Sequence, residues 1–347
     1  MPIRALVLLL VVSAMGYADD SLPIYVYPCP RVAAAPVLDG RLDDPAWAQA
    51  PLVSGFVLYG KPEVLAPVQT SVRVVYSDEA LVFGVRCEEP AMDRVTQVSH
   101  PRDEHAIFRT EAIEIFVDPE HSHSRYYQFA VNAAGSLYDS LRTDPVWNSE
   151  ATAAAFLGPD FWSLELSIPW QSLQVQPRPG AVVGFNVCRD RHIGEQRQWT
   201  MWAHVTEGFH DPVRFGHLVL SGTPEIIGGL GEELRKGDRH GAIVVFSAEG
   251  FAQTTYRELA AQSIAGLERL LADLGAEADR EQDAATAAEI RRRVAQHAAE
   301  LAALKRDAAG PLDALTWTAL DLRMQSTMRE LGQLLWEARL SALLSAI

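Results

Sequence analysis

Two neighbouring strand-like segments carry polar residues suited to ligand binding. Along residues 111–118 (EAIEIFVD) and 126–132 (YYQFAVN), apolar and polar side chains alternate with the period of two that a β-strand imposes. If the two strands pair, Glu114, Gln128 and Asn132 share one face with aromatic rings. Carboxylates and amides can hydrogen-bond vicinal sugar hydroxyls, and aromatic rings can stack on a pyranose. The face is therefore a candidate saccharide-binding surface, or else a solvated face of a half-buried sheet.

Two clusters have the composition of metal sites. His121 and His123 form a His-x-His pair in a turn, where two imidazoles can chelate zinc or copper, and a solvated loop is the alternative. Asp39, Asp43 and Asp44 could hold a structural calcium ion, and turn chemistry explains the same residues. Calcium is thus an open alternative, and no cofactor is certain.

No local motif for catalysis occurs in the sequence. Gly-x-Ser-x-Gly, His-Glu-x-x-His and phosphate-loop motifs are all absent. A glycosidase needs two carboxylates about 5 to 10 Å apart, but among 45 Asp and Glu residues such pairs discriminate nothing. We therefore predict no catalytic residue and a protein that is not an enzyme.

Charge and composition narrow the class of partner. The 347 residues include 30 Lys and Arg against 45 Asp and Glu, which gives a formal net charge of −15. Without a basic patch, this acidity argues against a nucleic acid as partner. A hydrophobic content of 48% with 22% charged residues is typical of a globular protein. At roughly 150 residues per domain, the length predicts about two domains.

The first residues have the pattern of a signal peptide. Arg4 precedes an apolar run at residues 5–12, and small residues follow up to Ala18. The run is shorter than the about 20 apolar residues that a membrane-spanning helix needs. We therefore predict a signal peptide at residues 1–18, no membrane span, and export to the periplasm or the extracellular space.

Three cysteines are an odd number, so they cannot all pair within one chain. Cys87 and Cys188 lie in strand-like runs and could be neighbours in a sheet. Together with Cys29, they could equally be buried free thiols.

A change in composition near residue 251 divides the chain. Of the 20 prolines, 19 precede this point, and the last 97 residues contain 23 alanines, which favours helices there. Short β-rich runs separated by turn signals predict an antiparallel β-sandwich before it. The predicted parts are a linker at residues 19–34, a sandwich at 35–221, a connector with a possible edge strand at 222–250, and a helical hairpin or three-helix segment at 251–347.

Five motifs resemble the family 9 carbohydrate-binding modules and their wider DOMON-like relatives. They occur in the family's order and cover roughly residues 35–220. The resemblance implies a jelly-roll-like β-sandwich that binds polysaccharide ends or small saccharides without catalysis, as an accessory module of polysaccharide degradation. The motifs are VLDGRLDDPAW from Val37, EIFVDP from Glu114, YQFAVN from Tyr127, GFN from Gly184 and DPVRFG from Asp211.

The same resemblance implies site residues. Where the sugar-binding members place two tryptophans that clamp the terminal sugar, this chain has Phe108 and Phe209, which can stack but have no indole N–H. The acidic residue matches as Glu114 and the asparagine as Asn132, whereas the arginine two residues earlier is Ala130, so one donor to the sugar is missing. The candidate carbohydrate-binding residues are Phe108, Glu111, Glu114, Gln128, Asn132, Phe209 and, from a polar loop, Trp147.

Two other functions stay open at this stage. Sandwich domains related to this family can bind haem, for which Met92, Met201, His204 and His210 are the candidate axial ligands. The protein could instead have a structural role, with an inert sandwich and a protein partner or self-association through residues 251–347.

Overall fold

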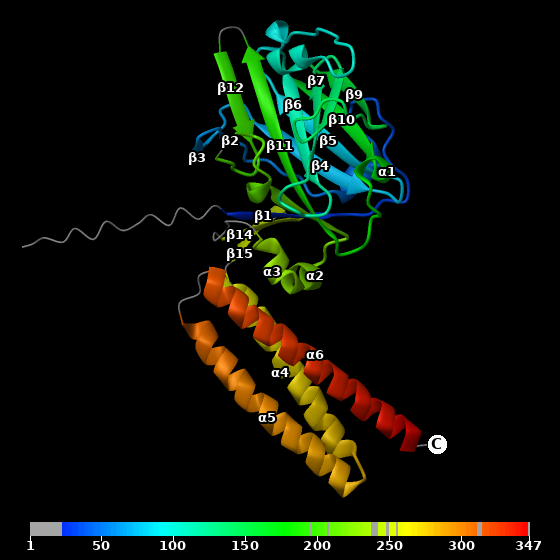
Figure 1. Ribbon diagram of the computed structural model, residues 1–347, viewed down its shortest axis with the longest axis vertical. Helices are drawn as coiled ribbons and strands as arrows, with labels where there is room; N and C mark the ends of the chain where they lie inside the picture. Colours follow the sequence, from blue (N-terminus) through cyan, green and yellow to red (C-terminus); the bar gives the residue numbers. More distant parts are fainter. Residues whose placement is uncertain are drawn as a thin grey trace, which may run out of the picture.

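The chain folds into a β-sandwich with a bundle of long helices below it in the view of Figure 1. The predicted signal peptide at residues 1–18 lies outside the described residues. The computed structural model describes residues 23–193, 196–206, 208–236, 242–247, 250–254, 256–310 and 314–345.

Two sheets form the sandwich. The smaller sheet contains, in spatial order, β4 (Thr70–Tyr76), β5 (Ala80–Glu88), β10 (Phe161–Pro169) and β9 (Thr152–Leu157). The larger sheet contains β1 (Ile24–Cys29), β2 (Val57–Leu58), β3 (Lys61–Leu65), β6 (Ala112–Asp118), β7 (Tyr127–Asn132), β8 (Leu137–Leu141), β11 (Val182–Ile193), β12 (Gln196–Met201), β13 (Gly216–Leu220), β14 (Ile243–Ser247) and β15 (Gly250–Thr254).

The long strand β11 organises the larger sheet. It pairs with β6 along one edge and with β13 and then β12 along the other, and β6 continues the sheet through β7 to β8. Among the described strands, only the pairs of β1 with β13 and with β14 are parallel. The antiparallel sandwich predicted from the sequence is therefore confirmed.

The predicted alternation of β6 and β7 places the core between the sheets. Ile115 of β6 lies opposite Phe129 of β7, and both side chains are fully buried in the inter-sheet core. Their polar neighbours, Glu114 and Gln128, consequently point to the outer face of the larger sheet.

The predicted linker at residues 19–34 contains a strand of the sheet. Ile24–Cys29 form β1, which lies between β13 and β14, so that Ile24 and Val26 are fully buried. Pro28 and Pro30 give this segment the composition of a loop, but both lie beyond residues 24–26, the part of β1 that pairs with β14. The strand expected near residues 242–246 corresponds to β14, which covers the other edge of β1.

A buried carboxylate holds the Asp39-Gly40 turn. The backbone N–H groups of Asp39 and Gly40 each donate to Glu165 of β10 at 2.8 Å, and the indole N–H of Trp47 donates at 2.9 Å. These three hydrogen bonds provide partners for both carboxyl oxygens of Glu165, whose side chain is buried.

Replacing Gly40 by alanine is expected to lower the free energy of unfolding by about 2 to 4 kcal/mol. Gly40 has φ +80°, and a Cβ atom there would lie 2.5 Å from the carbonyl carbon of Ala155. Gly55 is the matched control, because it has φ +83° but no atom within 4 Å of an added Cβ. Chemical denaturation of both variants measures the difference; equal losses would contradict this account of the turn.

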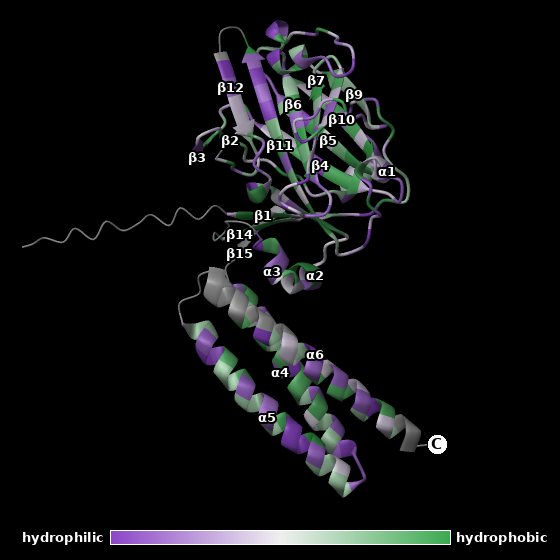
Figure 2. Ribbon diagram, viewed as in Figure 1, coloured by the Kyte–Doolittle hydropathy of each residue, from purple (hydrophilic) through white to green (hydrophobic). Residues whose placement is uncertain are grey.

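Three long helices form the bundle. They are α4 (Tyr256–Arg280), α5 (Ala284–Ala309) and α6 (Ala314–Ser345), and Figure 2 shows hydrophobic residues interspersed with hydrophilic ones along each. Leu267, Leu304 and Leu331 belong to one buried cluster that continues into Val219 and Ile243 of the larger sheet. No described helix is both long enough and apolar enough to span a bilayer.

The three cysteines are buried free thiols. Cys87 lies in the core between the sheets, whereas Cys188 packs beside Phe116 on the outer face of the larger sheet, so the sheet itself separates them. Burial raises the pKa of Cys87 to about 12, which disfavours its reactive thiolate.

Buried histidines join the larger sheet to α3 (Gly231–Leu234). The Nδ1 atom of His121 lies 2.7 Å from Glu233 Oε1, and its Nε2 atom lies 2.8 Å from His217 Nδ1. The His121 side chain is therefore neither a solvated loop residue nor a free ligand. Burial lowers the pKa of His121 to about 4, although the Glu233 carboxylate opposes the shift.

Lowering the pH is expected to destabilise the buried contacts of His121 between the larger sheet and α3. Because the pKa of His121 is about 4 in the folded chain and about 6.5 when unfolded, the unfolded chain binds the proton first. The contribution of His121 to the free energy of unfolding therefore decreases by about 2 kcal/mol between pH 7 and pH 4.5. Denaturation at both pH values should show that the free energy of unfolding decreases less on acidification in His121→Gln than in the wild type. An equal decrease in the two proteins would contradict the role assigned to His121.

Candidate functional site

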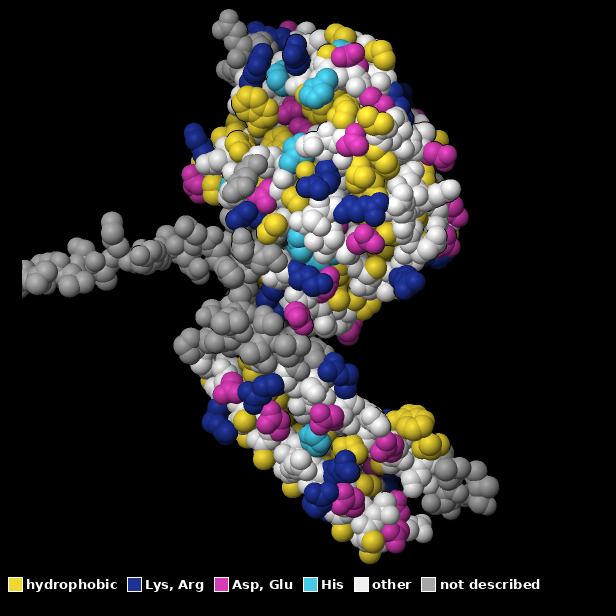
Figure 3. All heavy atoms as spheres, viewed as in Figure 1, with side chains coloured by type: hydrophobic (Ala, Val, Ile, Leu, Met, Phe, Trp, Pro, Cys, Tyr) yellow, Lys and Arg dark blue, Asp and Glu magenta, His cyan; other side chains and the backbone are white. Residues whose placement is uncertain are grey.

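A cavity of about 560 Å³ opens on the outer face of the larger sheet. Its floor comes from β6, β7 and β11, and its walls from β8, β12 and four connecting segments. In Figure 3, acidic atoms lie between hydrophobic and histidine side chains over the upper ends of β12, β11 and β6.

The floor of the cavity is polar. Gln128 donates its amide N–H to the carboxyl group of Glu114 and accepts a hydrogen bond from Ser140 Oγ at 3.2 Å. Glu114 is also hydrogen-bonded to Asp190 of the neighbouring strand β11. Burial raises the pKa of Glu114 to about 7, and burial together with the charge of Glu114 raises the pKa of Asp190 well above its usual range. The two acids therefore hold a proton between them near neutral pH.

The walls are aromatic. Trp199 lies opposite Asp190 in the β11–β12 register, and its side chain remains 44% exposed. The rings of Tyr59 and Phe209 meet edge to face with centroids 5.9 Å apart. Across the cavity lining, Phe108 and Tyr138 form a second such pair at 4.9 Å. Rings held in edge contacts keep little rotational freedom, so they offer preformed surfaces for stacking.

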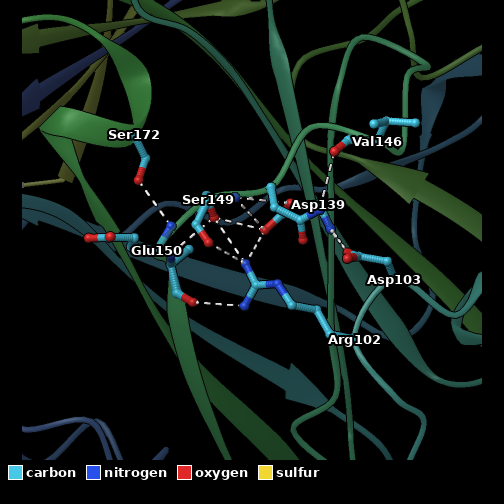
Figure 4. Close-up of polar contacts among 9 residues, drawn as sticks. Arg102, Asp103, Asp139, Val146, Ser149, Glu150 and Ser172 are labelled. Carbon is cyan, nitrogen blue, oxygen red and sulfur yellow. Dashed lines mark hydrogen bonds and ion pairs between the residues drawn. The ribbon is translucent and has the colours of Figure 1, made fainter.

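A network of polar contacts fixes the segment that carries Phe108. Figure 4 shows Arg102 beside Asp139, which is fully buried on β8. The Arg102 guanidinium also donates to Ser149 Oγ at 3.1 Å, and the Asp139 backbone N–H donates to Asp103 at 3.1 Å. These contacts attach the segment before η3 (His105–Arg109) to the sheet, so that His105 and Phe108 are held at the cavity.

Four of the seven residues predicted from the sequence line the cavity: Phe108, Glu114, Gln128 and Phe209. Asn132 points to the same face of β7 but is fully buried at the end of the strand. Its amide donates to the Val98 carbonyl at 2.9 Å, and its side-chain oxygen accepts the N–H groups of Ala134 and Ser136. Its side chain therefore stabilises a turn beneath the loop that covers it.

The other two predicted residues lie away from the cavity lining. Glu111 is buried beside Arg189, with an oxygen–nitrogen distance of 3.5 Å, and it accepts the backbone N–H of His192. Trp147 packs against Tyr127 at a ring distance of 4.6 Å, and Tyr127 points into the inter-sheet core. Strand parity could not locate either residue, because both lie outside the paired strands.

The predicted metal and haem ligands do not converge. No group of three or more histidine, cysteine or acidic residues suited to a metal ion occurs in the described part of the chain. Asp39 accepts the Arg41 N–H and Asp44 accepts the Ala46 N–H, the turn contacts that were the alternative to calcium, and Asp43 is exposed. Of the four proposed haem ligands, His210 alone lines the cavity, and its Nδ1 atom is hydrogen-bonded to the Tyr126 hydroxyl at 2.9 Å. Met92, Met201 and His204 are absent from the lining.

Sequence reasoning missed several lining residues. Strand parity places Trp199 and Trp202 on opposite faces without saying which of them is buried, and Trp202 is the buried one. Asp190 follows from the parity of β11, because Cys188 and Asp190 alternate with the inward Val187 and Arg189, but the partner strand was unknown. Tyr59 and Tyr138 come from a turn and a short strand that offered no signal in the sequence.

A β-sandwich with an open cavity on one sheet is the architecture of a binding module. Residues 38–223, more than half of the chain, match the family described as "Carbohydrate family 9 binding domain-like", and the chain therefore belongs to that family. Modules of this family are non-catalytic, which agrees with the prediction that the protein is not an enzyme. The comparison with curated proteins gave no match.

Two solved structures of family 9 modules from Caldicellulosiruptor kristjanssonii are similar to this chain. The one in complex with cellotriose is 18% identical, has a TM-score of 0.43, and is matched over 58% of this chain and 95% of that chain. The one in complex with glucose is also 18% identical, has a TM-score of 0.45, and is matched over 58% of this chain and 97% of that chain.

Proposed function

We propose that this protein is an exported, non-catalytic carbohydrate-binding protein that holds a saccharide in the cavity of the larger sheet. The observation that carries the proposal is the cavity itself, which aromatic rings and hydrogen-bonding side chains line together on a family 9 domain. The two similar family 9 modules described above are in complex with cellotriose and with glucose, which makes glucans the first ligands to examine.

The proposed binding mode combines stacking with hydrogen bonding. A sugar ring resting against Trp199 and Phe209 would remove apolar surface from water, while Glu114 and Gln128 would reach its hydroxyls. Because Gln128 and Glu114 already contact each other, the floor is ordered before the sugar arrives. Such preorganisation reduces the entropy cost of binding.

The proposed function includes export of the protein and a role for its helices in binding a partner. The signal-peptide pattern of residues 1–18 supports export to the periplasm or the extracellular space. The helices α4, α5 and α6 pack on the end of the sandwich at β13 and β14, whereas the cavity lies over β6, β7 and β11. A protein partner or a second copy could therefore bind the helices without covering the cavity.

Isothermal titration calorimetry of the full chain with a panel of gluco-, xylo- and amino-oligosaccharides tests the proposed saccharide binding. The proposal expects saturable binding of at least one of them, with competition between ligands that share the cavity. Absence of binding by every member of the panel at millimolar concentration would overturn it.

A further inference from the structure

The two acids on the cavity floor lack the arginine partners that two neighbouring buried acids have. Glu89 and Glu111 lie beside the guanidinium groups of Arg189 and Arg191, at distances of 2.7 to 3.5 Å. In contrast, the groups that influence Glu114 are Asp190 and Gln128, and those that influence Asp190 are Glu114 and Glu111. Within the described residues, no arginine or lysine side chain lines the cavity.

The charge of this pair favours the binding of a cation. Two carboxyl groups that share a proton in a buried position carry unfavourable negative charge, which an incoming cation would stabilise by charge-assisted hydrogen bonds. The rings of Tyr59, Trp199 and Phe209 line the same cavity, and aromatic faces attract cations. Ala130, opposite Glu114 in the register, brings no competing charge.

We propose that the saccharide recognised by this cavity carries a free, protonated amino group, which binds between Glu114 and Asp190 while the ring stacks on the aromatic wall. The inference rests on the proposed function, since it names the class of sugar for the same cavity. An amino sugar fits better than a simple ammonium compound because Gln128 supplies the floor with an amide for neighbouring hydroxyls.

The titratable groups around the pair are few. His105, Tyr59, Tyr138 and His210 line the cavity, Cys188 lies beside the pair on β11, and Glu111 lies beneath it. Burial lowers the pKa of His210 and raises that of Tyr138, so both are neutral near pH 7. The charged Arg197 acts on His192 farther along β11 and β12, and Arg142 acts on Tyr126; neither lines the cavity.

Binding of an ammonium group should therefore release the shared proton. As the pH falls from about 7 towards 5, protons compete with the ligand, and the affinity for an amino sugar should decrease by up to about tenfold per pH unit. A neutral sugar does not compete with the proton, so its affinity should not show this decrease.

The experiment is calorimetry of the full chain with three β-1,4-linked disaccharides: those of glucosamine, of N-acetylglucosamine and of glucose. Acetylation removes the charge and keeps the ring, so it is the matched control. We expect the glucosamine disaccharide to bind at least about tenfold more tightly at pH 7, with proton release visible as a dependence of the heat on buffer ionisation. Asp190→Asn and Glu114→Gln should each reduce the ratio between charged and neutral ligands.

The outcomes separate this inference from the proposed function. Equal or tighter binding of the neutral disaccharides, or binding without proton release, overturns the inference and leaves saccharide binding intact. Choline, an ammonium compound without a sugar ring, is the fourth ligand to test. Binding of choline but of none of the disaccharides overturns both the inference and the proposed function, because the site would then accept ammonium without a sugar. Binding of no ligand at all also overturns both.

Discussion

Replacing Arg189 by methionine is expected to lower the free energy of unfolding by about 3 to 5 kcal/mol. Arg189 is 1% exposed, and its guanidinium lies 3.2 Å from Glu89 and 3.5 Å from Glu111. It also donates to the Glu88 carbonyl at 2.9 Å. Removing it leaves Glu111 without its nearest cation and Glu89 with Arg191 alone, while the space stays filled by the methionine side chain.

Arg31→Met is the matched control for that experiment. Arg31 forms an ion pair with Asp78, but both side chains are about half exposed or more, at 49% and 65%. Because surface ion pairs contribute about 0 to 1 kcal/mol, this variant should unfold almost like the wild type. Denaturant unfolding at pH 7 gives both values. A loss in Arg189→Met no larger than that in Arg31→Met would contradict the role of the buried network.

Replacing Trp199 by alanine is expected to weaken saccharide binding by about tenfold to a hundredfold. Trp199 is the largest ring of the cavity lining, and with 44% of its surface exposed it has area left for a ligand. Its position on β12 opposite Asp190 places the ring beside the acidic floor. The affinity for whichever oligosaccharide binds the wild type is to be compared by calorimetry.

Trp336→Ala controls for the general effect of removing an exposed tryptophan. Trp336 is 63% exposed on α6, away from the sandwich, so its replacement should leave the affinity for the oligosaccharide unchanged. Trp199→Phe should retain part of the affinity, because a smaller ring still stacks. An unaltered affinity in Trp199→Ala would show that the sugar does not use this wall.

The sequence predicts the framework better than the site. Alternation along β6 and β7 correctly separates the buried Ile115 and Phe129 from the outer Glu114 and Gln128, because strand geometry is local. β1 escaped prediction because its burial comes from β13 and β14, strands more than 180 residues away in the chain.

The site is harder to predict because it depends on which strands become neighbours. Asn132 has the correct parity, yet the loop at Val98 covers it. Asp190 and Trp199 become part of the cavity only through the pairing of β11 with β6 and β12. In this way, a local pattern can identify a face, whereas long-range pairing decides which part of that face stays open.

The crystal structure of the full chain with a bound oligosaccharide tests the central claim most directly. We predict a sugar ring in the cavity, stacked on Trp199 or Phe209 and within hydrogen-bond distance of Glu114. A sugar bound on the smaller sheet or on the helices, with the cavity empty, would contradict the assignment of the site.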